Sequence, residues 1–129
     1  MTIEQINPDG LFQSPVFSQA TIAPAGRTLY IGGQNGIDAA GNLAKGIAAQ
    51  TKQVFENIDT ILAAVGATPA DVAKLTIALA DTVDPTEGFQ AVPAEWATVR
   101  TAITVLLVSR LGMSPDTFVE VDAVVALPA

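Results

Sequence analysis

The sequence predicts an α+β fold, with two helices packed on one face of a mixed β-sheet in the order ββαβαββ. Three observations support this class. Residues 47–65 carry apolar side chains every three or four positions, as an amphipathic helix does. Several short runs rich in β-branched residues alternate with turns that contain glycine or proline, which is typical of strands. The length of 129 residues fits one domain, assigned to residues 1–129.

The first half of the chain contains two predicted strands and the clearest helix. Residues 18–23 and 28–33 are expected to be strands around the Pro-Ala-Gly-Arg turn at 24–27. The helix at 47–65 ends before Gly66, because glycine readily takes the left-handed conformation that closes a helix.

The second half of the chain is predicted to contain three strands and one weaker helix. Leu75, Ile77 and Leu79 alternate with smaller residues, which indicates a strand over 74–80. Asp84 opens a helix that we expect to reach about Val99, with a kink at Pro93. The remaining segments are a strand at 101–111, a loop at 112–116 and a last strand at 117–127.

Composition excludes several classes of function. The chain has no cysteine and no histidine, so thiolate nucleophiles, iron–sulfur clusters, Ser-His-Asp triads and imidazole metal sites are ruled out. No carboxylate motif for a hard cation occurs, and we expect neither a metal nor a cofactor. Six basic against thirteen acidic residues give a net charge of −7, the wrong balance for nucleic acid. No leader or membrane-spanning run is found, so a cytoplasmic protein without membrane contact is expected.

The apolar content indicates that copies of the chain associate. Half of the residues are hydrophobic and the mean hydropathy is +0.42. Two helices cover one face of the sheet, yet residues 102–108 are apolar on both faces. Another subunit is therefore expected to cover the second face.

Six segments, in order, carry a family resemblance. They are Phe17-Ser18-Gln19-Ala20, Leu29-Tyr30-Ile31-Gly32-Gly33-Gln34, Gln50-Thr51 with Asn57, Ile61-Leu62-Ala63-Ala64-Val65-Gly66-Ala67, Asp71-Val72-Ala73-Lys74-Leu75-Thr76 and Phe118-Val119-Glu120-Val121-Asp122-Ala123. Together they make the chain resemble the RidA/YjgF family, often labelled endoribonuclease L-PSP, over nearly its whole length.

The resemblance implies a chorismate-mutase-like homotrimer with a central barrel and three clefts between subunits. It also implies hydrolysis of small enamines and imines, such as 2-aminoacrylate, to 2-oxo acids and ammonia. In such enzymes an arginine clamps the substrate carboxylate, and a glutamate helps water attack the imine carbon. Glu120 matches that glutamate, and Gly33 and Gln34 match a Gly-Gln pair at the end of a strand.

Two departures remove hydroxyl groups that could contact a ligand. Phe17 stands where the family usually has tyrosine, and Gly32 where it usually has serine. Both positions, with Gly33 and Gln34, are still expected to line the ligand site.

The arginine has two possible registers. A gapless alignment places Ile103 at the arginine position and makes it a ligand-site residue, and this register is preferred because an insertion would interrupt a paired strand. The alternative keeps Arg100 as the clamp and lengthens the segment before Glu120 by about five residues. Arg110 on the rim of a neighbouring subunit is a third option.

Other polar and aromatic residues have structural interpretations. Asp122 is expected to be solvated, and Trp96 to be a packing residue. Gln50 and Asn57 are expected to join the helix to a loop by hydrogen bonds. The amides of Gln34 and Asn35 are expected to satisfy backbone groups at the strand end, and donation to a ligand is the alternative.

The leading hypothesis is a homotrimer that binds a small carbonyl, imine or enamine metabolite between subunits, with Glu120 and Arg100 as catalytic candidates. The alternative is a trimer that binds a small ligand or partner without catalysis. Ribonuclease activity is not favoured, because the chain is acidic and lacks histidine.

Overall fold

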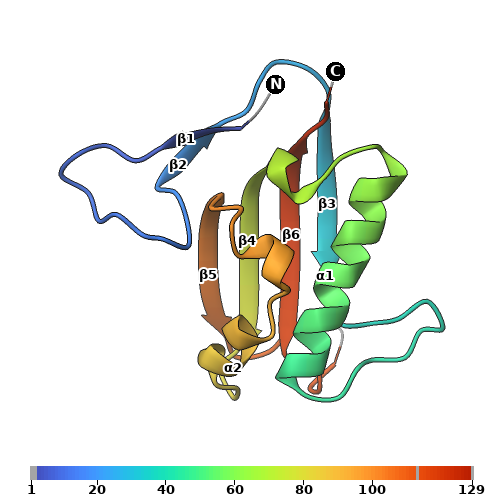
Figure 1. Ribbon diagram of the computed structural model, residues 1–129. Coiled ribbons are helices and arrows are strands. Elements are labelled where there is room, and N and C mark those ends of the chain that lie inside the picture. Colours follow the sequence, from blue (N-terminus) through green and yellow to red (C-terminus); the bar gives the residue numbers. More distant parts are fainter. Residues whose placement is uncertain (1–2, 113, 129) are drawn as a thin grey trace.

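The computed structural model describes residues 3–112 and 114–128 and confirms the α+β class (Figure 1). Its main sheet has four strands in the order β3-β6-β4-β5. Strands β4 and β5 run parallel, and the other neighbours run antiparallel. The bounds are β3 Thr28–Gln34, β4 Val72–Ala80, β5 Ala102–Val108 and β6 Val119–Ala126.

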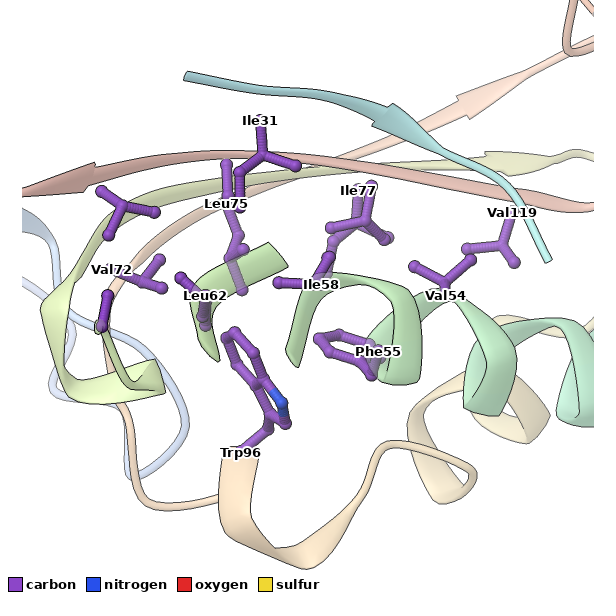
Figure 2. Close-up of a cluster of buried hydrophobic side chains, with 14 of the residues drawn as sticks. Ile31, Val54, Phe55, Ile58, Leu62, Val72, Leu75, Ile77, Trp96 and Val119 are labelled. Carbon is purple, nitrogen blue, oxygen red and sulfur yellow. The ribbon is translucent and has the colours of Figure 1, made fainter. Parts of the chain in front are cut away.

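The helices lie on one face of this sheet, as predicted (Figure 1). Helix α1 spans Ile47–Ala64 and directs its buried apolar side chains at the sheet. In Figure 2, Ile58 and Leu62 of α1 point toward Ile77 and Leu75 of β4, and all four are buried. This packing removes the apolar stripe of the helix and one face of the sheet from water, which is the main stabilising contribution to such a fold.

The second helix is shorter than the sequence predicted. Helix α2 covers Pro85–Gln90, and a separate 3-10 turn, η2, covers Ala94–Trp96. Pro93 separates the two because it has no backbone N–H to donate and disfavours the helical conformation in the residue before it. The expected continuation to Val99 is therefore wrong.

The N-terminal segment also differs from the prediction. A short strand β1 (Glu4–Ile6), which the sequence did not indicate, pairs antiparallel with β2 (Ala20–Ile22). The predicted strand at 18–23 is thus in a separate two-stranded sheet, and it does not flank β3. In Figure 1 the two-stranded sheet of β1 and β2 projects away from the main sheet. Strand β1 has no alternation of apolar and polar side chains that could have predicted it, because Glu4 and Gln5 are both polar and exposed.

The opposite face of the sheet has no covering layer within the described part of the chain. The strand registers place Lys74, Thr76, Ala78, Thr104, Leu106, Glu120, Asp122 and Tyr30 on it. Leu106 is 47% exposed and Tyr30 is 76% exposed. Leu107, which faces the helices, is 59% exposed as well, because the helical layer is short. None of the described helices has the length and apolar content required to span a membrane.

Candidate functional site

Glu120 lies on the open face near the start of β6 and is half-buried. Its Oε1 accepts a hydrogen bond of 3.2 Å from Nδ2 of Asn35. A Cβ atom at Gly33 would lie 2.7 Å from Cδ of Glu120, closer than real contacts allow. Glycine at this position therefore allows the carboxylate to lie against the backbone of β3.

A β-bulge in β3 shapes the backbone that lies next to the Glu120 carboxylate. The pairing of β3 with β6 shifts between Ile31 and Gln34, at Gly32 and Gly33. Nε2 of Gln34 donates to the carbonyl of Gly32 at 3.1 Å, so this amide satisfies a nearby backbone group, as predicted. Bulges of this kind locally end strand pairing and redirect side chains.

Two amides of α1 fix the loops around this end of the sheet, as the sequence predicted. Nδ2 of Asn57 donates to the carbonyls of Asn35 and Ile37, at 3.2 and 2.9 Å. Gln50, which is 1% exposed, bonds Ala44, Asp116 and Phe118. The backbone next to Glu120 is therefore held from the helical layer.

Arg100 lies at the opposite end of the sheet, directly before β5. It has a φ of 49°, which is the only positive φ outside glycine among residues 3–112 and 114–128. Its Nη2 donates to the carbonyl of Ser14 at 3.0 Å, while its Nε is buried without a hydrogen-bond partner in the described chain. The hydroxyl of Ser18 donates to the carbonyl of Arg100, and the amide of Ser18 donates to the carbonyl of Thr101 at 3.0 Å.

The Arg100 environment combines a charge and backbone strain. Non-glycine residues in the left-handed region are held there by their surroundings and concentrate at functional sites. Here the hydrogen bonds of Ser18 hold the backbone of the turn. The identified partner of the guanidinium is a neutral carbonyl, so this contact does not neutralise the positive charge.

One protomer does not bring Arg100 and Glu120 together. Glu120 pairs with Ala78, whose partner on the other side is Leu106, whereas Arg100 precedes Ala102. From Ala102 to Leu106 is about 13 Å along the strand, and β5 and β6 are about 10 Å apart across β4. Figure 1 shows the start of β5 and the start of β6 at opposite ends of the sheet.

The remaining predicted residues lie near Arg100, on the helix side of the sheet or in the loop after β5. Phe17 is half-buried, and its amide donates to Oγ of Ser14 at 3.4 Å, which places it with Arg100. Ile103 pairs with Leu75 and packs against the core on the helix side. Arg110 is exposed in the loop after β5.

The loop between β5 and β6 affects the choice between the two alignments of the family arginine, with Ile103 or with Arg100. Strand β5 pairs with β4 without interruption from Ala102 to Val108. The connection to β6 runs over residues 109–118, so additional residues would fall in this loop and leave the ladder intact. The reason for preferring the register with Ile103 at the arginine position is therefore removed.

Sequence reasoning assigned no supporting role to Ser14 or Ser18, and the amide of Asn35 was expected to donate to a ligand or to backbone groups and not to Glu120. Ser14 and Ser18 hold the Arg100 turn, and Asn35 contacts Glu120. A signal was present, since Ser18 lies within one matching segment and Asn35 directly follows another, but their partners lie more than 80 residues away along the chain. Within residues 3–112 and 114–128, no cluster of three or more acidic side chains could hold a metal ion.

Comparison with known proteins gives consistent matches. A family model described as Endoribonuclease L-PSP matches residues 12–127. A RutC family protein of Pyrococcus horikoshii is 35% identical over 112 residues, covering 85% of this chain and 87% of that protein. The 2-iminobutanoate/2-iminopropanoate deaminase of Bos taurus is 44% identical over 70 residues, covering 53% of this chain and 50% of the deaminase.

Solved structures match over almost the whole chain. The Rid family protein YyfB of Yersinia pestis has a TM-score of 0.86 at 30% identity, covering 98% of this chain and 100% of that one. RidA of an Antarctic Psychrobacter species has a TM-score of 0.71 at 30% identity, covering 89% and 97%.

Proposed function

The chain belongs to the endoribonuclease L-PSP family, also called RidA/YjgF, and from this premise we propose that it is an imine and enamine deaminase whose active sites lie between the subunits of a homotrimer. The proposed substrate is a small 2-imino acid or its enamine tautomer. Mammalian relatives named as 2-iminobutanoate/2-iminopropanoate deaminases support this class, although the match covers half of their length.

The proposed reaction is a hydrolysis. Arg100 pairs with the substrate carboxylate, and Glu120 accepts a proton from a water molecule whose oxygen attacks the imine carbon. The proton is then delivered to nitrogen, the C–N bond of the resulting carbinolamine breaks, and a 2-oxo acid and ammonia leave. One water molecule is consumed, and no oxidant or reductant is required.

The observation that carries this proposal is the state of Arg100. Its guanidinium is half-buried, one nitrogen has no partner in the described chain, and its backbone is held in a strained conformation. An incompletely satisfied cation is suited to an anionic ligand, because charge-assisted hydrogen bonds to a carboxylate contribute about 1.5–3 kcal/mol each.

The separation of Arg100 from Glu120 supports a site between subunits. Neither group alone combines an anion clamp with a carboxylate that can orient water. A ring of three chains would place the Arg100 group of one protomer against the Glu120 group of the next, and it would also cover the open face of the sheet.

The first test compares charge-neutralising variants. The rate of ammonia release is measured with 2-imino acids generated in situ. Arg100→Gln and Glu120→Gln are expected to lower kcat/KM on the order of 10- to 100-fold, because each removes a charge-assisted contact. Arg27→Gln, in an exposed turn, is the matched control and is expected to keep full activity. If Arg110→Gln lowers the rate while Arg100→Gln does not, the assignment of Arg100 is wrong.

The second test asks whether the site is shared. Arg100→Gln and Glu120→Gln chains, each strongly impaired by itself, are unfolded together and refolded as mixed trimers. A mixed trimer has one interface at which both side chains are intact, so random mixing is expected to restore about a quarter of the wild-type rate. No recovery in verified mixed trimers would contradict a site built by two protomers.

A ligand-binding trimer without catalysis is the second candidate. The absence of hydroxyl groups at Phe17 and Gly32 favours it, since both positions adjoin the two groups described above. Saturable binding of 2-oxo acids without any acceleration of imine hydrolysis would support this candidate over the deaminase.

A further inference from the structure

A cavity of about 630 Å³ lies beside the helical layer, and Val99 and Thr101, on either side of Arg100, are part of its wall. It opens between β1, the C-terminal half of α1, the 3-10 turn η1 (Pro69–Asp71), η2 and the turn before β5. Neither Arg100 nor Glu120 lines it. Its volume is within the range of about 300–1,000 Å³ typical of small-molecule sites.

The cavity wall combines apolar surface with two carboxylates. Oδ1 of Asp59 accepts a hydrogen bond of 3.1 Å from Nε1 of Trp96, which fixes the carboxylate in a half-buried position. Glu95 is an exposed acidic side chain at the rim. The apolar lining consists of Ile3, Pro69, Ala70, Val72 and Val99.

The negative charge of this wall has no basic counterpart in the cavity. No lysine or arginine of the described chain lines it. Burial raises the pKa of Asp59, the hydrogen bond from Trp96 lowers it, and the neighbouring charges of Glu95 and Glu56 raise it further. A cation in the cavity would offset both the burial of this carboxylate and its repulsion by the neighbouring acids.

We propose that this cavity binds an organic cation, a primary amine or guanidinium carried on a short apolar body. The cationic head would donate charge-assisted hydrogen bonds to Asp59 and Glu95, and the methylene groups would contact the apolar lining. A bare metal ion is the poorer occupant, because the described residues provide no cluster of three acidic ligands. The proposal is independent of the deaminase activity.

The position of Trp96 gives a direct test, because it is the only tryptophan of the chain. Its fluorescence is followed while butylamine or agmatine is added, with butyrate and butanol as controls of similar size. A saturable change is expected with both cations and with neither control. Glu95→Gln and Asp59→Asn are each expected to weaken binding on the order of tenfold, because each removes one charge-assisted contact.

Two features protect this test from trivial failure. Asp59→Asn keeps an oxygen that can accept from Trp96, and Glu95 is exposed, so both variants should fold. Glu87→Gln, on α2 outside the cavity, is the matched control and should bind amines as the wild type does. The proposal is overturned if no saturation occurs below about 50 mM amine, if butyrate or butanol acts equally, or if Glu95→Gln and Asp59→Asn leave the affinity unchanged.

Discussion

At the scale of single residues, polar side chains with few partners carry most of the functional argument. Arg100 combines a positive φ, a neutral carbonyl partner and a buried nitrogen without a partner in the described residues. Asp59 is a half-buried carboxylate whose identified partner is the indole N–H of Trp96. Both arrangements are unfavourable by themselves, and this is the reason for proposing a ligand of opposite charge at each.

Asp59 predicts a pH dependence of stability. Its pKa is raised in the folded chain, mainly by burial, above the unfolded value of about 3.9. The folded state therefore holds the proton to higher pH, and the favourable contribution of protonated Asp59 is lost as pH rises through the folded pKa. Asp59→Asn should melt above the wild type at pH 7, and the difference should shrink toward pH 3.

Thermal denaturation followed by circular dichroism from pH 3 to pH 7 measures this difference. Glu87→Gln, exposed on α2 and not among the groups that shift the pKa of Asp59, controls for the general loss of a negative charge. A difference between wild type and Asp59→Asn that stays constant across this range would contradict the assignment.

Gln50 is the second residue with a measurable role. Its side chain donates to the carbonyls of Ala44 and Asp116 and accepts from the amide of Phe118, at 2.8–3.0 Å. Gln50→Met has a similar shape but leaves all three backbone groups unpaired. The free energy of unfolding should fall by about 3 kcal/mol, measured by urea denaturation. Gln53→Met, whose identified bond is to the side chain of Asn57, should lose less than 1 kcal/mol.

At the scale of elements, the bulge in β3 and the loop after it decide where Glu120 lies. Three glycines there face different neighbours. A Cβ atom added at Gly32 would meet no atom within 4 Å, and one added at Gly33 would meet the flexible end of Glu120. A Cβ atom added at Gly36 would lie 2.6 Å from the backbone Cα of Gln50. The same added methyl group should therefore have three different effects.

Alanine substitutions separate these effects. Gly32→Ala should change stability little, because the added methyl group would meet no atom within 4 Å. Gly33→Ala should move the Glu120 carboxylate and reduce activity, at a stability cost below about 1 kcal/mol, because a side chain yields easily. Gly36→Ala should destabilise the fold by about 2 kcal/mol or more, because helix α1 itself must shift. Equal losses of stability at Gly33 and Gly36 would contradict this interpretation of the bulge.

At the scale of the whole molecule, the open face of the sheet predicts self-association. Leu106 and Tyr30 expose apolar surface on a face that no described element covers. Light scattering should give a mass of about 40 kDa, three times the 13.3 kDa of the chain. Leu106→Glu should shift the mass toward 13.3 kDa and abolish activity, because the shared sites would be lost.

The control for this prediction is an exposed apolar residue on the helix side. Val65, at the end of α1, is 40% exposed, and Val65→Glu should leave the mass unchanged. A wild-type mass of 13.3 kDa at micromolar concentration would contradict both the trimer and the shared active site.

The sequence by itself determined the α+β class, helix α1 and the faces of β4, because the periodicity of apolar residues is a local property. It also indicated Trp96 as a packing residue and the bonding roles of Gln50 and Asn57. Only the tertiary structure decided that α2 stops before Pro93 and that β2 pairs with an N-terminal strand. It alone placed Glu120 and Arg100 at opposite ends of the sheet and opened a cavity beside Asp59. The physical reason is that strand partners, bulges and cavities depend on contacts between residues far apart in the chain, which no local pattern of side chains specifies.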